Sequence, residues 1–291
     1  MIDFILAITQ STGYIVRTNM RFFNVAEELE TMATGLSRRQ AQIAKMIHQR
    51  NFLRVEDLAE HFNVTAQTIR RDVNCLCDYG IARRRHGGVE QPARTGNDAY
   101  AWRQVHNAEA KKTIAREVAR HVPGGVSLAF SIGTTPEIVM EALLAHDQLR
   151  ILTNNLNVAM LACTNPAFEV TIAGGRLRND DRDVLGPGME MLFTAYKVDI
   201  GIYGVAGVDE DGTLLDFYEE EVRARQTIRE NSRASFLVLD STKFGRTAHV
   251  RGGQIGEATK VFCERRPPEA IVTRLANAGA HLVVCDGKAT A

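Results

Sequence analysis

The segment between residues 36 and 80 repeats apolar residues three and four positions apart, as on one buried face of a helix. These repeats predict one helix over 38–50 and a shorter one over 55–62. A third helix is predicted to begin after Thr65, whose hydroxyl can accept a hydrogen bond from a first-turn N–H, and to end at Gly80. Short helices joined by a tight turn in this order predict a helix-turn-helix, with the third helix as its recognition helix.

The third predicted helix separates an apolar stripe from a polar face. Ile69, Val73 and Leu76 form the stripe, and amide, hydroxyl and guanidinium groups lie on the other side. A helix fits the major groove of DNA and presents its N-terminal residues to base edges. The candidate DNA-contacting residues are Thr65, Gln67, Thr68, Arg70, Arg71 and Asn74. We interpret Asp72 differently, as the ion-pair partner of a neighbouring arginine.

The stretch from Ile81 to Val89 predicts a β-hairpin after the recognition helix, because Gly87-Gly88 allows a tight turn. Three consecutive arginines precede this turn. Adjacent arginines alone are typical of a solvated face. Beside a helix-turn-helix they indicate a wing that reaches phosphates or the minor groove. The candidate contacts in the wing are Arg84, Arg85 and His86.

Positive charge is concentrated in this part of the chain. The whole sequence has 35 Lys and Arg against 35 Asp and Glu, so its formal net charge is zero. Residues 36–90 alone contain ten basic and six acidic side chains. A basic excess confined to one segment of a neutral chain indicates a polyanionic partner for that segment. We therefore predict operator-type DNA as a partner.

This region resembles the signature of the DeoR family of bacterial transcriptional repressors. The residues that carry the resemblance are Arg39, Ile43, Ile47, Thr65, the run 68–73 and the wing sequence 83–88. The resemblance implies a winged helix-turn-helix that binds operator DNA as part of a homo-oligomer, either a dimer or a tetramer.

A second domain follows, in which short apolar strands alternate with amphipathic helices. A chain of 291 residues has room for it beside a winged helix of roughly 55 residues. One continuous helix is predicted over 100–121. Strands are predicted at 126–130, 150–153, 169–173, 199–205, 235–239, 260–263 and 281–285, and helices at 136–144, 156–162, 190–195, 219–229 and 268–277. The alternation predicts an α/β fold with a mainly parallel sheet covered by helices.

Polar and glycine residues follow five of these strands where each strand ends. In α/β sheets, ligands bind at the carboxyl ends of the strands. Pro136 opens a helix, and Thr134 and Thr135 lie at its N-terminus, where free N–H groups bind phosphate, although the loop lacks the Gly-Lys of an ATP-binding P-loop. One such loop is typical of an ordinary turn, but five together predict a pocket for a small phosphorylated, hydroxylated effector. The candidate effector-binding residues are Ser131, Gly133, Thr134, Thr135, Thr153, Asn154, Asn155, Gly174, Gly175, Arg176, Gly204, Gly207, Glu221, Arg225 and Lys243.

This second domain resembles the sensor domain of the DeoR family, which is similar to the ribose-5-phosphate isomerase fold. The runs 132–137, 152–159, 173–178 and 230–233 most resemble members that respond to sn-glycerol 3-phosphate, and the resemblance implies this effector. The family often has Lys-Arg after the helix glutamate, whereas this chain continues from Glu221 to Val222, Arg223, Ala224 and Arg225. Arginine does not replace lysine neutrally at a close ligand contact.

These patterns predict a fold class of α/β with an N-terminal winged helix-turn-helix and a C-terminal sensor domain. The predicted segments are an extension over 1–35, the winged helix-turn-helix over 36–90, a linker over 91–108, and an effector-sensing, oligomerising domain over 109–291. The extension has no core pattern. We interpret it as sequence upstream of a later translation start, with an arm that lacks fixed structure as the alternative.

Composition limits the remaining chemistry. A hydrophobic content of 45% and a charged content of 24% are typical of a globular protein, and no apolar run is long enough to span a membrane. The five cysteines (Cys75, Cys77, Cys163, Cys263 and Cys285) lack zinc-ligand spacing, and the eight histidines are scattered. We predict reduced thiols in the cytoplasm, no metal and no cofactor.

The predicted function is a transcriptional repressor, not an enzyme, released from its operator by a small phosphorylated inducer. One alternative is a phosphosugar isomerase-like enzyme carrying a DNA-binding module, with Glu221, Asp240 and Lys243 as acid-base groups. Others are a repressor that senses a different sugar phosphate and a constitutive architectural DNA-binding protein. The sequence leaves open the operator, the regulated genes and the choice between dimer and tetramer.

Overall fold

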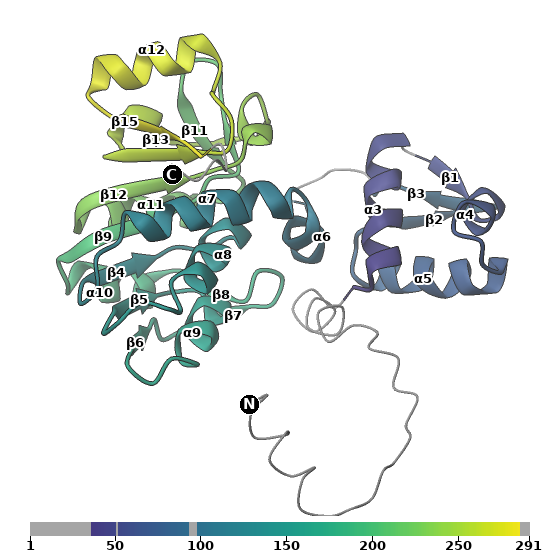
Figure 1. Ribbon diagram of the computed structural model, residues 1–291, viewed down its shortest axis with the longest axis horizontal. Coiled ribbons are helices and arrows are strands. Elements are labelled where there is room, and N and C mark those ends of the chain that lie inside the picture. Colours follow the sequence, from purple (N-terminus) through teal and green to yellow (C-terminus); the bar gives the residue numbers. More distant parts are fainter. Residues whose placement is uncertain (1–35, 51, 93–97, 286–291) are drawn as a thin grey trace, which may run out of the picture.

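The computed structural model describes residues 36–50, 52–92 and 98–285. A small N-terminal domain (residues 36–92) lies beside a larger C-terminal domain (residues 108–285), and a short helix lies between the two (Figure 1). The interpretation of segment 1–35 falls outside the described residues.

The N-terminal domain is the predicted winged helix-turn-helix. Its elements are α3 (Arg38–Arg50), β1 (Phe52–Arg54), α4 (Val55–His61), α5 (Ala66–Asp78), β2 (Arg83–Arg85) and β3 (Gly88–Glu90). Thr65 caps α5 as predicted, because its Oγ1 accepts from the Thr68 N–H at 3.2 Å. At the other end, Gly80 takes the left-handed conformation with φ 67°. The predicted stripe of Ile69, Val73 and Leu76 lies in the buried core.

The single helix predicted over 100–121 is wrong. The structure has two helices there, α6 (Tyr100–Val105) and α7 (Ala108–Arg120). The break is at Asn107, which adopts the left-handed conformation with φ 55°. Asparagine tolerates this conformation better than most residues, so the chain turns here without a glycine. Apolar residues keep their helical spacing on both sides of Asn107, so the sequence pattern does not reveal the break.

The C-terminal domain is built on a seven-stranded parallel sheet with the order β15-β14-β12-β9-β4-β5-β6. Its strands are β4 (Ser127–Phe130), β5 (Arg150–Thr153), β6 (Glu169–Ile172), β9 (Val198–Tyr203), β12 (Ser232–Val238), β14 (Lys260–Cys263) and β15 (His281–Val284). The chain runs outward from β4 to β5 and β6 in one direction, and from β9 to β15 in the other. The order therefore reverses between β4 and β9.

Helices cover both faces of this sheet, which makes a three-layer α/β/α domain (Figure 1). Residues alternate between the faces, so Phe236 and Val238 pack on one side and Leu237 on the other. The first face carries α7, α8 (Thr134–Ala142) and α9 (Leu156–Ala162). The second carries α10 (Pro187–Thr194), α11 (Glu219–Glu230) and α12 (Glu269–Ala278). The α/β fold class is thus confirmed.

Several short elements were not predicted. They are β7 (Leu177–Arg178), β8 (Asp183–Val184), β10 (Gly207–Val208), β11 (Thr213–Asp216), β13 (Val250–Gln254) and two 3-10 turns (Ser241–Lys243 and Ile255–Glu257). They form a small antiparallel sheet, β10-β11-β13, and the hairpin β7-β8. The strands β7, β8 and β10 have two residues each, too few for a pattern to stand out. β13 contains Gly252 and Gly253, which are typical of turns.

Candidate functional site

The N-terminal domain exposes the polar face of α5 and the tip of its wing. The exposed residues among the predicted contacts are Thr65, Gln67, Arg70, Arg71, Asn74, Arg84, Arg85 and His86, and Thr68 is half-buried. Thr68 also contacts the cap, since its hydroxyl lies 2.9 Å from that of Thr65. Eight of the nine predicted DNA contacts are therefore open to solvent, and they present amide, hydroxyl, guanidinium and imidazole groups.

Asp72 is buried and forms an ion pair, but its partner is not an arginine close to it in the sequence. Its carboxylate accepts from Arg39 Nε of α3 at 2.6 Å and from Gln40 Nε2 at 3.1 Å. The predicted pairing with a neighbouring arginine is corrected in this respect. The pair fixes α5 against α3, and so sets the direction in which Arg70 and Arg71 face.

Two of the three wing arginines, Arg83 and Arg85, form ion pairs with the same carboxylate. Glu90 on β3 accepts from Arg83 at 2.5 Å and from Arg85 Nη1 at 3.1 Å. The Arg85 guanidinium also lies 6.0 Å from the centre of the Phe52 ring. At the base of the turn Gly88 is required, because an added Cβ would come within 2.3 Å of the Leu53 carbonyl. Gly88 thus lets β3 pack closely on β1, and the paired strand β2 carries the three exposed arginines.

A polar cavity, here called the switch-point pocket, opens where the strand order of the C-terminal domain reverses. The loop after β4 supplies Ser131 to Pro136, and the loop after β9 supplies Gly204 to Ala206. Such crevices form in open α/β sheets because the flanking loops leave in opposite directions. The remaining lining residues are Arg103, Asp216, Glu221, Val238, Lys243 and Arg246.

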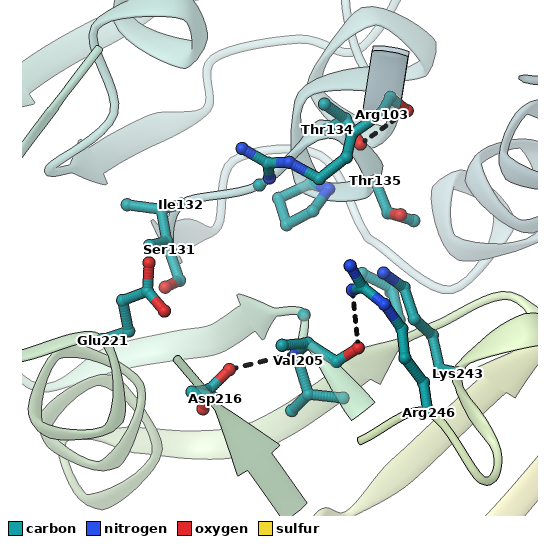
Figure 2. A pocket seen from close by; sticks show the side chains of 15 residues that line it. Arg103, Ser131, Ile132, Thr134, Thr135, Val205, Asp216, Glu221, Lys243 and Arg246 are labelled. Atoms are coloured by element: carbon teal, nitrogen blue, oxygen red, sulfur yellow. Dashed lines mark hydrogen bonds between the residues drawn. The ribbon is translucent and has the colours of Figure 1, made fainter. Parts of the chain in front are cut away.

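Three cations line this pocket: Arg103, Lys243 and Arg246. Figure 2 shows Lys243 and Arg246 pointing into it from one side, with Arg103 and Thr134 across from them. Burial, with Arg246 close by, lowers the pKa of Lys243 to about 8. In the described part of the chain, no hydrogen bond or ion pair is made by the Lys243 ammonium. Clustered cations beside the N-terminus of α8 form a site for an anion.

The other end of the pocket is acidic. Glu221 and Ser131 lie there, away from Lys243 and Arg246 (Figure 2). Burial raises the pKa of Glu221, against the effect of Arg178, whose Nη2 donates to its Oε1 at 2.9 Å. A carboxylate and a hydroxyl are suited to ligand hydroxyl groups. The cavity is about 60 Å³ and open to one side.

Thr134 connects this pocket to α6 and α7. Its hydroxyl donates to the backbone carbonyl of Arg103 at 3.2 Å and accepts from Lys111 Nζ at 3.0 Å. Lys111 also donates to the same carbonyl. Burial, followed by the charge of Lys243, lowers the pKa of Lys111 to about 7. The first turn of α8 is therefore joined to α6 by a buried network.

The pocket brings together the predicted residues Ser131, Gly133, Thr134, Thr135, Gly204, Glu221 and Lys243. It does not include Thr153, Asn154, Asn155, Gly174, Gly175, Arg176, Gly207 or Arg225. The loops after β5 and β6 lie on the far side of the strand reversal. There Asn155 caps α9 and donates to Glu137 at 2.9 Å, and Asn154 donates to the Val184 carbonyl at 2.9 Å.

Arg225 has a structural position. It is buried on α11, with 2% of its surface exposed, and donates through Nε and Nη2 to Asp216 Oδ2 at 3.2 and 2.8 Å. Its Nη1 donates to the Gly252 carbonyl at 2.7 Å. All three contacts hold α11 to the small antiparallel sheet. Arg225 itself does not line the switch-point pocket, although its partner Asp216 does.

Sequence reasoning missed three charged residues of the pocket: Arg103, Asp216 and Arg246. Arg246 could have been found by extending the predicted loop after β12 beyond Gly245. Asp216 ends a short strand that was not predicted. Arg103 had no local signal, because it comes from a helix outside the sheet.

Other site chemistry is limited. Cys75, Cys77, Cys163 and Cys263 carry free thiols. Within the described ranges, no cluster of three or more His, Cys, Asp or Glu side chains is placed to hold a metal ion. In the same ranges, no helix combines the length and the apolar character needed to cross a bilayer.

Both domains match known protein families. Residues 39–95 match the DeoR-like helix-turn-helix domain, and residues 106–265 match the DeoR C terminal sensor domain. The glycerol-3-phosphate regulon repressor of Escherichia coli (strain K12) is 40% identical over 249 residues, which are 86% of this chain and 99% of the relative. The repressor of the same name from Haemophilus influenzae is 41% identical over 252 residues, 87% of this chain and 98% of the relative.

More distant matches share less. The HTH-type transcriptional repressor CsqR of Escherichia coli is 34% identical over 84% of this chain and 94% of its own length. A ribose 5-phosphate isomerase A structure from Methanocaldococcus jannaschii has a TM-score of 0.36 at 16% identity, covering 47% of this chain and 55% of that one. A Pyrococcus horikoshii eIF-2B structure has a TM-score of 0.41 at 11% identity, covering 72% and 73%. Neither structural likeness carries a functional argument.

Proposed function

Because this chain belongs to the DeoR family of DNA-binding transcriptional repressors, we propose that its switch-point pocket binds sn-glycerol 3-phosphate and that this effector releases it from operator DNA. The relatives that match over most of the chain are repressors, so the isomerase alternative is not favoured. The proposal extends to this chain the effector that two relatives carry in their names.

One observation supports a phosphate ester above other ligand classes. Lys243 and Arg246 face the first turn of α8, where the N–H groups of Thr134 and Thr135 open the helix (Figure 2). An ester phosphate can accept from those N–H groups and from the two cations together. Glu221, at the other end, can accept from the hydroxyls of a short polyol.

The operator is engaged by the N-terminal domain. Its exposed α5 face enters the major groove, and the wing arginines reach phosphates beside it. Half to two-thirds of such contacts go to the DNA backbone, so most of these residues position the helix and a few select bases. We propose that two copies of the chain, joined through their C-terminal domains, bind half-sites about one DNA turn apart.

Arg71→Ala is expected to weaken operator binding and to reduce its salt dependence. Arg71 is exposed on α5, where its guanidinium can neutralise one phosphate. Loss of one phosphate contact lowers the slope of log affinity against log salt by about 0.9. Fluorescence anisotropy with labelled operator DNA at several salt concentrations measures this slope. Arg223→Ala, which removes an exposed arginine from α11, is the matched control and should change neither value. An unchanged slope in Arg71→Ala would remove Arg71 from the interface.

The effector is tested by a thermal-shift titration with sn-glycerol 3-phosphate, with glycerol, fructose 6-phosphate and ribose 5-phosphate beside it. A ligand that binds only the folded state raises Tm by mass action. We expect a concentration-dependent rise with sn-glycerol 3-phosphate and none with glycerol, which lacks the anion. A rise with a sugar phosphate alone would keep the anion site and reassign the effector. No rise with any ester would contradict the proposed ligand class.

The affinity for sn-glycerol 3-phosphate is expected to be highest between about pH 6 and about pH 8. A phosphate monoester gains its second charge near a pKa of about 6. On the alkaline side, Lys243 loses its proton as the pH rises through its lowered pKa of about 8, so the attraction weakens. Titration calorimetry across this range measures the profile. In Lys243→Arg the alkaline loss should disappear, because a guanidinium stays charged. A variant that loses affinity in step with the wild type would assign the transition to another group.

A further inference from the structure

Helix α6 is embedded in the N-terminal domain through one of its faces. Ala101 and Trp102 are buried, with 8% and 6% of their surfaces exposed, and belong to the same apolar core as the recognition helix. The Trp102 ring lies 5.1 Å from that of His48 on α3 and 4.8 Å from that of His106. Movement of α6 therefore moves the ring that packs on α3.

The other face of α6 is bound to the C-terminal domain. The Tyr100 hydroxyl donates to the Glu137 carboxylate of α8 and accepts from Asn157 Nδ2 of α9 at 2.8 Å. Burial raises the pKa of both Tyr100 and Glu137. Arg103 pairs with Asp181 and extends its guanidinium into the switch-point pocket (Figure 2). One short helix thus contributes Arg103 to the pocket and Trp102 to the DNA-binding domain.

Two features next to α6 would allow it to move: a break in the helix at Asn107 and a cavity beside it. Asn107, in its left-handed conformation, separates α6 from α7, and its side chain donates to Asp240 at 2.9 Å and to Thr242 at 3.1 Å. Asp240 and Thr242 begin the loop that carries Lys243. A second cavity, of about 250 Å³, lies between the domains and is lined by His48 and Trp102. Arg103, Lys243 and Arg246 line both cavities.

We propose that α6 is the element that transmits effector binding to the winged helix, with Arg103 as the group that senses the ligand. The inference rests on the proposed function, since it needs an anionic effector in the switch-point pocket. Among the described residues that line that pocket, Arg103 is the one that comes from outside the sheet domain, and it lines the second cavity as well. An anion draws the Arg103 guanidinium from Asp181 toward itself. The helix then pivots at Asn107 and shifts Trp102 against α3.

Trp102 reports on this movement directly, because it is the one tryptophan in the chain. In the full-length protein without DNA, saturation with sn-glycerol 3-phosphate is expected to change the intensity or wavelength of tryptophan emission. The change should follow the same concentration dependence as the thermal shift. Lys243→Met, which removes a ligand cation, should abolish both signals at the same concentrations. A thermal shift in the wild type with constant emission would overturn the role of α6.

The coupling itself is measured as the factor by which the effector weakens operator binding, typically about 5–150-fold for allosteric proteins. In Trp102→Leu, which keeps an apolar side chain but loses the ring, this factor should fall by at least about fivefold. Affinities for operator without effector, and for effector without operator, should each stay within about threefold. Val55→Ala is the matched control, since it perturbs the same core on α4, far from α6 (Figure 1), and should keep the coupling.

The outcomes separate the two proposals. A coupling factor in Trp102→Leu equal to that of the wild type, with both affinities retained, would overturn the inference about α6 and leave the effector proposal intact. Absence of any thermal shift with the phosphate esters in the wild type would overturn the proposed function, and the inference with it. If Trp102→Leu does not fold, the emission change of the wild-type protein still decides between the outcomes.

Discussion

Arg225→Met is expected to lower the free energy of unfolding by about 3–5 kcal/mol, as is typical when one partner of a buried ion pair is removed. Arg225 and Asp216 have side chains only 3% and 8% exposed, and the variant leaves the Asp216 carboxylate without its counter-charge. Methionine fills most of the volume of the arginine stem, so the loss reports on charge more than on packing. Chemical denaturation followed by circular dichroism measures it.

Two further variants show whether the ion pair is responsible. Arg225→Met combined with Asp216→Asn should regain part of the loss, because the buried charge is gone while an amide oxygen can still accept from the Ala206 N–H. Arg223→Met, two residues away on the exposed side of α11, should change stability by less than about 0.5 kcal/mol. If Arg225→Met were as mild as Arg223→Met, the assignment of Arg225 as a structural residue would be wrong.

Lys243→Met is expected to act in opposite directions on stability and on induction. Burial, followed by the charges of the nearby Arg246 and Arg103 guanidiniums, disfavours the ammonium in the folded free protein and lowers the pKa of Lys243 to about 8. Its removal should therefore stabilise the free protein at neutral pH by about 1–3 kcal/mol. A buried partner for the phosphate is lost at the same time, so Kd for sn-glycerol 3-phosphate should rise at least about 30-fold. Operator binding should be unchanged and no longer released by the effector.

The pH dependence of stability identifies Lys243 as the source. Because its folded-state pKa lies below the unfolded value of 10.5, the charged form opposes folding, and stability rises as the pH increases from about 8 toward 10.5. Lys111, with a pKa of about 7, contributes a similar rise that begins at lower pH. The difference between wild type and Lys243→Met isolates the first rise. A variant less stable than the wild type at pH 7 would contradict the conclusion that the buried, charged ammonium opposes folding.

The local sequence pattern was sufficient to predict elements that form one uninterrupted apolar or amphipathic run. The limits of β5, β14 and α9 agree with prediction at both ends, because each is a continuous apolar or amphipathic run between polar residues. The recognition helix and its Thr65 cap were predicted for the same reason. The start of β12 at Ser232 was missed by three residues, since Ser232 and Arg233 are polar and only partly buried or exposed, so they do not continue the apolar run.

About half of the predicted effector-binding residues line the pocket. The strand order decides which loops meet there, and strand order cannot be read from a local sequence pattern. Rules for α/β sheets place a ligand at the carboxyl ends, and this selected Ser131 and Thr134 correctly as pocket residues. Nothing in the sequence pattern says that β9 pairs with β4 while β5 leads away from the reversal. The loop at Asn154 was therefore grouped with the others. The partner of Asp72, 33 residues distant, is non-local in the same way.

The two ends of the switch-point pocket come from separate parts of the chain. The anion end depends on the first turn of α8 and the loop after β12, whereas the hydroxyl end depends on Glu221 at the start of α11. If the proposed effector site is correct, a substitution at Glu221 changes which ester fits without disturbing the anion contacts or the recognition helix. Under that proposal, metabolite selection and promoter selection diverge independently after gene duplication, each through a few substitutions.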